Sequence, residues 1–268
     1  MKKLGFIGMA VMAMLVSANL SSCSKEDGNS SGFVNKYANE KKITKIVSES
    51  VTYAQTSRTT TTFKYDSNGR LIETIDEYKG PNNQEESRGI AQYTWTNTAV
   101  IYTEEYEIKS THHGNFTETY KFKYGLSNGL VRSVDYGDGD SENLSYNEDG
   151  RYDNEGTWEW NGDKLICVLG DYKVLYTYGE PCKSGYYYPI ADIDASALFL
   201  AHPELLGVRT KQLPVSCKGS GYYAQDVSPY TSTYEYEFDT EGYIIKTIVT
   251  RKFDNGSIHT FTDTITWE

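Results

Sequence analysis

The sequence predicts an all-β protein, a mainly antiparallel meander of hairpins curled into an open or closed barrel, with one short helical insert. Composition is the first observation behind this prediction, because 14% of the residues are aromatic, 24 residues are Tyr and only six are Pro. Such a composition suits pleated, half-buried surfaces. The second observation is a short phrase that recurs along the chain. In it aromatic and polar residues alternate, a polar turn ends in Gly, and an aliphatic residue begins the next run.

The clearest copy of this phrase covers residues 63–72. Phe63 and Tyr65 are two positions apart, so both rings lie on the same face of a strand. Asp66 favours a turn through hydrogen bonds from its side chain to the backbone, and Gly69 tolerates the positive φ that such turns require. Related phrases begin at Phe122, Leu144, Trp158, Tyr236 and Phe253. Each phrase predicts a strand, a tight turn and a second strand.

The same alternation places the remaining strands. The segments that fit a strand are 43–53, the Thr-rich run up to 63, 71–78, 90–95, 99–108, 116–124, 165–169, 172–178, 231–238, 243–253 and 258–267. Residues 79–83 combine Gly, Pro and Asn and indicate a turn. Residues 110–115 form a polar tip between two strands.

Residues 181–230 depart from this pattern and are predicted to hold the helical insert. Asp194 is a suitable N-cap, residues 195–200 favour a helix, and Gly207 is a suitable stop. Pro203 would break the helix. We expect this helix to plug or cap the sheet.

The N-terminus predicts export and lipidation. Residues 1–22 begin with a charged region, continue through an apolar run that is too short to span a bilayer well, and end in Leu-Ser-Ser before Cys23. This pattern resembles the bacterial lipoprotein signal, in which cleavage before the Cys leaves Cys23 as the lipidated first residue. An ordinary secretory signal followed by a chance Cys is the alternative.

Residues 23–32 are small and polar, typical of a flexible tether, and residues 33–268 are predicted to form a single all-β domain. The net charge is −11, and loss of Lys2 and Lys3 with the signal would make it more negative. This balance argues against nucleic acid or anionic lipid headgroups as partners. A mean hydropathy of −0.58 and the absence of a second long apolar run exclude a helical membrane span.

Cys182 and Cys217 begin two similar phrases in the insert. In an oxidising compartment a disulfide between them would hold the base of the insert. It would close a loop of about 35 residues and contribute about 3 to 4 kcal/mol. Buried free thiols are the alternative, because Cys167 leaves an odd number of thiols.

Tyr residues follow both Cys phrases and are the candidate ligand-binding residues. They are Tyr186, Tyr187, Tyr188, Tyr222 and Tyr223. If the two phrases lie together, these rings would form a cluster on which a saccharide could stack. Alternatively, the rings seal the helix against the sheet.

No catalytic residue, metal site or cofactor is predicted. Residues 135–142 hold four carboxylates, but a calcium loop needs Gly at the sixth position, where Asn143 stands when counted from Asp138. An acidic hairpin tip is the alternative. The adjacent His112 and His113 would point apart and make a poor metal site. No nucleophile elbow, phosphate loop or Cys-His signature is present, although sequence alone does not pair the carboxylates of a hydrolase.

Three features carry a resemblance to a known group of proteins. They are the box before Cys23, the Tyr-Asp-x-x-Gly-Arg-Leu turn at 65–71, and the passage 193–207 followed by 211–214. With them the chain resembles Bacteroidetes cell-envelope lipoproteins built on a domain of unknown function with a porin-like fold. The resemblance implies a β-rich architecture without an active site. The acidic pair at 26–27 resembles an export signal to the outer leaflet of the outer membrane, with a solvated linker as the alternative.

The leading hypothesis is a non-enzymatic binding protein, lipid-anchored to the outer membrane through Cys23, that captures a glycan or nutrient. A structural or assembly partner of an outer-membrane complex is one alternative. A hydrolase with unidentified carboxylates is the other. A barrel that itself spans the membrane is disfavoured, because candidate outward positions include Lys, Glu and Thr and the chain ends in Trp267-Glu268.

Overall fold

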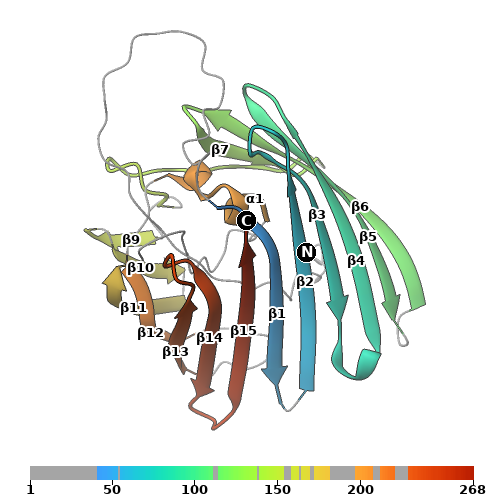
Figure 1. Cartoon of the computed structure of the whole chain (residues 1–268). Helices are drawn as coiled ribbons and strands as arrows, with labels where there is room; N and C mark the ends of the chain where they lie inside the picture. Colours follow the sequence, from blue (N-terminus) through green and yellow to red (C-terminus); the bar gives the residue numbers. More distant parts are fainter. Residues whose placement is uncertain are drawn as a thin grey trace.

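The computed structural model describes residues 41–53, 55–110, 114–137, 139–153, 158–162, 164–169, 172–181, 197–207, 212–220 and 229–268. These residues form one antiparallel sheet of 15 strands with a short α-helix beside it (Figure 1), which confirms the predicted fold class. The strands are β1 (Ile43–Thr52), β2 (Gln55–Tyr65), β3 (Leu71–Lys79), β4 (Glu85–Trp95), β5 (Ala99–Ser110), β6 (Gly114–Ser127), β7 (Leu130–Asp135), β8 (Ser141–Asn143), β9 (Trp158–Asn161), β10 (Lys164–Leu169), β11 (Tyr172–Pro181), β12 (Gln212–Ser220), β13 (Tyr230–Phe238), β14 (Ile244–Phe253) and β15 (Ile258–Trp267). The helical segments are α1 (Ala197–Ala201) and the short 3-10 turns η1 (Pro81–Asn83) and η3 (Pro203–Leu206). No helix in the described part of the chain is long and apolar enough to cross a membrane.

The first and last strands pair with each other in the interior of the sheet. The strand order runs β8 to β1, then β15 to β9, so β8 and β9 are the two edges. Every other neighbouring pair is consecutive in the chain, as expected for a meander of hairpins. The β1 and β15 pairing, which sets Ile46 opposite Ile265, joins the two halves of the meander. Because the two edges do not pair, the barrel is open.

The recurring phrase forms a specific turn. Asp66 Oδ1 accepts hydrogen bonds from the backbone N–H groups of Asn68 and Arg70, at 2.8 and 3.0 Å. Gly69 has φ 75°, which confirms the predicted left-handed conformation. Asn147 and Asp239 accept the same pair of backbone hydrogen bonds in the turns that precede Arg151 and Tyr243.

A Trp indole anchors the residue that follows each of these turns. Trp95 Nε1 donates to the carbonyl oxygen of Leu71 at 2.7 Å, and Trp267 Nε1 donates to that of Ile244 at 2.7 Å. Trp160 Nε1 makes the equivalent bond to Tyr152 at 2.9 Å. Each turn is therefore held both by its own carboxylate or amide and by an indole from a later strand.

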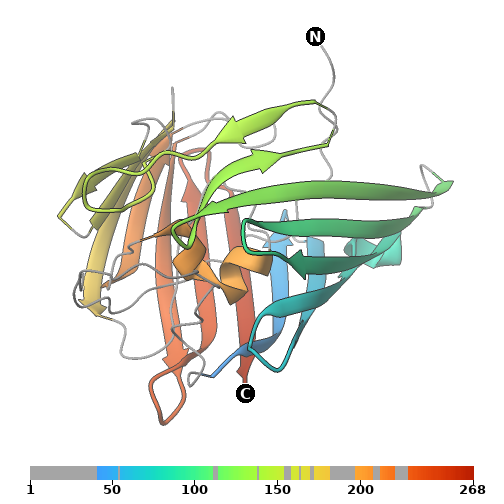
Figure 2. The ribbon, with the colours of Figure 1, turned by 90° about the horizontal axis from the view of Figure 1, so that it is seen from above.

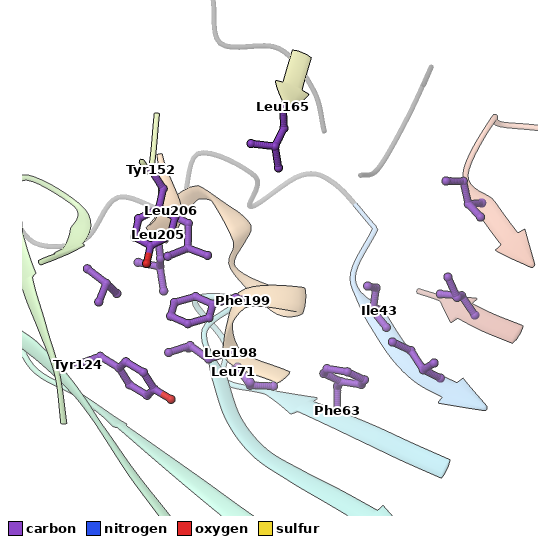
Figure 3. Close-up of a cluster of buried hydrophobic side chains, with 14 of the residues drawn as sticks. Ile43, Phe63, Leu71, Tyr124, Tyr152, Leu165, Leu198, Phe199, Leu205 and Leu206 are labelled. Atoms are coloured by element: carbon purple, nitrogen blue, oxygen red, sulfur yellow. The ribbon is translucent and has the colours of Figure 1, made fainter. Parts of the chain in front are cut away.

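The helical segments form a plug inside the curve of the sheet (Figure 2). The predicted helix is present as α1, the helical geometry breaks at His202 before η3 begins at Pro203, and Gly207 ends the segment with φ 82°. Asp194, its expected N-cap, lies outside the described residues. Leu198 and Leu205 are fully buried, and the ring of Phe199 meets that of Tyr124 on β6 edge-on at 5.5 Å (Figure 3). The plug fills one end of the inner face.

The two faces of the sheet differ in character. The face that touches the plug, called the inner face, includes Val100 and Tyr124 together with every second residue along their strands. The outer face carries cross-strand ion pairs between directly opposed residues. These pairs are Glu49–Arg58, Lys64–Glu73, Glu77–Arg88, Lys79–Glu86 and Glu237–Lys246.

Two segments differ from the prediction. Residues 181–230 were predicted as an insert, but β12 within them is a strand of the main sheet between β11 and β13. Pro214 and Gly219 interrupt the usual strand composition there. The phrase that begins at Leu144 makes only an isolated bridge between Tyr146 and Tyr152 instead of a full hairpin.

Candidate functional site

The site residues predicted from the sequence lie mostly outside the described residues. These residues are Cys23, Cys182, Tyr186, Tyr187, Tyr188, Tyr222 and Tyr223. Cys217 is described, and it is a free thiol that is 3% exposed. Its Sγ lies 3.2 Å from the hydroxyl of Tyr234, on the next strand. Cys217 is therefore unbridged in this structure, and its predicted pairing with Cys182 stays a prediction.

The predicted acidic segment at 135–142 connects β7 to β8. The backbone N–H of Tyr136 donates to the carbonyl of Asp140 at 3.0 Å, so the segment is a hairpin tip. Among the described residues, no group of three or more His, Cys, Asp or Glu side chains has an arrangement that could hold a metal ion. His112 and His113 lie outside the described residues.

The structure instead brings carboxylates together on the inner face of β3 to β6. Asp76 on β3 is opposite Gly89 on β4, and Glu104 on β5 is opposite Ala91, one inner position further along β4. A side chain at Gly89 would overlap Oε1 of Glu104. The missing side chain at Gly89 therefore lets the Glu104 carboxylate lie across β4 towards Asp76.

Both carboxylates have raised pKa values. Burial raises the pKa of Asp76 to about 6, and the negative charge of Glu104 adds to the rise. A hydrogen bond of 2.5 Å from Thr61 Oγ1 lowers the pKa of Asp76 in part. Burial also raises the pKa of Glu104, although the Tyr102 hydroxyl donates to Oε2 at 2.5 Å and lowers it. These carboxyls accept protons more readily than ordinary acids do.

Aromatic rings lie beside the carboxylates. The rings of Tyr102 and Phe122 are stacked, with centroids 5.3 Å apart and planes 9° apart. The centroid of the Tyr120 ring lies 6.4 Å from that of Phe122, and the Tyr120 hydroxyl donates to the carboxylate of Glu118. Tyr106, also half-buried, bonds to Ser87 on β4 at 2.6 Å.

These side chains define the acidic-aromatic surface. Its members are half-buried side chains on the inner face, from β3, β4, β5 and β6, beyond the plug. They are Asp76, Glu85, Tyr102, Glu104, Tyr106, Glu118, Tyr120 and Phe122. The surface can offer carboxylate oxygens and ring faces to one ligand.

A second set of buried polar residues lies on the inner face of β13 to β15. Asp263 is 3% exposed, and burial raises the pKa of its carboxyl to about 7 despite a hydrogen bond from Ser48. Arg251 donates from Nε to Ser232 Oγ at 3.1 Å, and its guanidinium lies 4.2 Å from the centroid of the Tyr230 ring. These residues are too buried to be a binding surface.

By its open, curved sheet and the helical plug on the inner face, the chain is an all-β protein of the open-barrel class. The fold is similar to the crystal structure of a porin-like protein from Bacteroides uniformis ATCC 8492, with TM-score 0.56, 16% identity, and coverage of 84% of this chain and 98% of that one. A porin-like protein from Bacteroides vulgatus ATCC 8482 aligns with TM-score 0.27 and 11% identity, over 85% of this chain and 99% of that one. No family model and no curated protein matches the chain.

The sequence carries a signal for this surface, although none of its members was among the predicted site residues. Tyr102, Glu104 and Tyr106 alternate along β5, and Glu118, Tyr120 and Phe122 alternate along β6. Period-two spacing places each set on one face. Only the strand register shows that the residues from β5 and those from β6 lie on the same face as Asp76.

Proposed function

We propose that this protein is a non-enzymatic binding protein of the cell envelope that captures a saccharide on the acidic-aromatic surface. The observation that carries the proposal is the position of half-buried rings and carboxylates side by side on one inner face. Tyr120 and Phe122 offer ring faces, and Glu104 and Glu118 lie within the same patch.

The chemistry of these groups suits a polyhydroxylated ligand. The C–H face of a sugar ring packs on an aromatic ring, and Tyr provides a large contact area at low entropic cost. Carboxylates accept hydrogen bonds from hydroxyl groups, and charged acceptors make stronger bonds than neutral ones. Curvature of the sheet would let several residues contact one oligosaccharide.

The envelope location is supported by the sequence and by the fold. The predicted lipid on Cys23 would anchor the chain through the tether at 23–32. The similar Bacteroides uniformis structure is described as porin-like, which favours an outer-membrane setting for this fold. The ion pairs of the outer face would be costly against lipid, so a tethered domain is favoured over one that spans the membrane.

Removal of one ring tests the proposal. Mature protein would be screened by thermal unfolding against neutral, cationic and anionic oligosaccharides, and hits measured by calorimetry. Tyr120→Ala should weaken binding at least about tenfold, equivalent to about 1.4 kcal/mol. Thr119→Ala is the matched control, because Thr119 is the exposed neighbour on the outer face of the same strand. Equal affinities of the two variants, or no binding of any saccharide, would contradict the proposal.

A saccharide hydrolase is the second candidate function. The observation in its favour is the raised pKa of Asp76, about 6, since a general acid needs a carboxyl that stays protonated near the working pH. Release of reducing ends from a bound oligosaccharide, lost in Asp76→Asn and kept in Glu77→Gln, would establish hydrolysis. Unchanged ligand after prolonged incubation would leave binding as the function.

A further inference from the structure

We infer that the ligand of the acidic-aromatic surface is an oligosaccharide that carries free, protonated amines, rather than a neutral or acidic one. This inference rests on the proposed function and adds the charge of the ligand to it. It follows from the distribution of charge over the two faces of the sheet.

The inner carboxylates of β3 to β6 have no basic side chain beside them among the described inner-facing residues of β1 to β6. Four acids, Asp76, Glu85, Glu104 and Glu118, point to the inner face of β3 to β6. The inner-facing positions of β1 to β6, as far as the structure describes them, contain no Lys or Arg.

The outer face of the same strands shows the opposite arrangement. There Glu49, Glu73 and Glu77 each lie within 3.8 Å of a basic side chain on the neighbouring strand. Among the described residues of β1 to β6, these solvated acids therefore have basic partners, whereas the half-buried inner acids have none. Half-buried carboxylates are costly when they lack a compensating charge, and a cationic ligand would supply that charge.

The carboxylates of Asp76 and Glu104 are positioned to bind a cationic ligand. The Tyr102 hydroxyl donates a hydrogen bond to one oxygen of Glu104, and the Thr61 hydroxyl donates one to an oxygen of Asp76. The second oxygen of Glu104 lies over Gly89, in the space that a side chain there would fill. Gly89 is therefore a positioning residue that directs Glu104 towards Asp76.

The neighbouring rings fit the same ligand. An ammonium group is attracted to an aromatic ring face within about 6 Å of its centroid. The rings of Tyr102 and Phe122 stack beside the Glu104 carboxylate. An amino sugar would present its ammonium to the carboxylates and its C–H face to the rings. A uronate, sulfate or phosphate ester would be repelled.

The test compares oligosaccharides of different charge. Mature protein would be titrated at physiological ionic strength with glucosamine oligomers, their N-acetylated counterparts of equal length, and galacturonate oligomers. We expect the free amines to increase affinity at least about tenfold and the galacturonate oligomers not to bind. Glu104→Gln should remove most of the gain due to the amines.

Glu105→Gln is the matched control, because Glu105 follows Glu104 on β5, faces outward and is exposed. It changes the net charge equally, so an equal loss in both variants would mean non-specific attraction and would overturn the inference. Thermal unfolding of both variants would verify that they fold.

The remaining outcomes are distinct. Equal affinity for the glucosamine and N-acetylated oligomers would overturn the charge assignment and leave the proposed function standing. Tight binding of the galacturonate oligomers would also overturn the charge assignment and leave the proposed function standing. Binding of none of the three would contradict the proposed function itself. A lysine tetramer that binds as tightly as the amino sugar, with the same dependence on Glu104, would overturn the saccharide as ligand.

Discussion

The backbone N–H of Leu71 donates a hydrogen bond of 2.9 Å to Nε2 of His202, 131 positions further along the chain. Because Nε2 accepts this bond, the ring carries its proton on Nδ1, which donates to Glu204 at 3.0 Å. The imidazole is fully buried, with Trp95 edge-on at 5.0 Å. One neutral His thus fastens the plug to the turn between β2 and β3.

Loss of this imidazole should destabilise the protein. His202→Ala removes the acceptor for Leu71 and leaves a buried N–H group and a cavity, which costs about 2 to 4 kcal/mol. The measurement is the free energy of unfolding in urea at neutral pH. Glu204→Gln is the control, because the amide oxygen can still accept from Nδ1, so a much smaller loss is expected. A His202→Ala midpoint equal to that of the wild type would refute the role of the plug contact.

The Trp anchors should act independently of one another. Trp95→Phe and Trp267→Phe each remove an indole N–H that satisfies a carbonyl at the start of a strand. Each should lower the free energy of unfolding by about 1 to 2 kcal/mol. The two sites have separate partners, so the double variant should show the sum within about 0.5 kcal/mol. A marked departure from additivity would mean that the two anchors share an interaction not seen in their separate contacts.

Asp263 should make stability fall as the pH rises. Burial raises the folded pKa of its carboxyl to about 7, above the ordinary Asp value of 3.8, so the folded state holds the proton more tightly than the unfolded state. The contribution of Asp263 to the free energy of unfolding is therefore highest below about pH 4 and declines as the pH rises through about 7. Asp263→Asn should remove that decline and exceed the wild type at pH 8 by up to about 4 kcal/mol, while the two proteins converge near pH 4.

The check on Asp263 is the difference in unfolding free energy between the two proteins across this pH range, in which contributions of other groups cancel. A constant difference with pH would show that Asp263 is ionised in the folded protein throughout.

Burial in the folded protein, and not a disulfide, should protect the thiol of Cys217 from alkylation. Its side chain is 3% exposed, so alkylation of the native protein should leave it unmodified. Alkylation in denaturant without reductant should then modify Cys217, as peptide mass spectrometry would show. If modification of Cys217 in denaturant requires a reductant, the thiol is bridged, and the predicted pairing with Cys182 becomes the first candidate.

Local features of this fold were predictable because their physics is local. The alternation of Phe63 and Tyr65, the acceptor at Asp66 and the conformation of Gly69 depend on a few adjacent residues, and the structure confirms the strand and the turn. The break at Pro203 and the stop at Gly207 are likewise properties of single residues. The strand β12 was missed because its Pro and Gly obscure the alternation.

The sequence by itself determined most of the strands, the turn chemistry and the short helix, since these depend on the period of the side chains and on backbone preferences. Only the tertiary structure decided the register of the strands and the pairing of the first strand with the last. It placed β1 against β15, the indole of Trp95 on Leu71, and Glu104 over Gly89 beside Asp76. The physical reason is that pairing is settled by burial and backbone hydrogen bonding summed over whole strands, and a shift of one residue would turn these carboxylates to the opposite face.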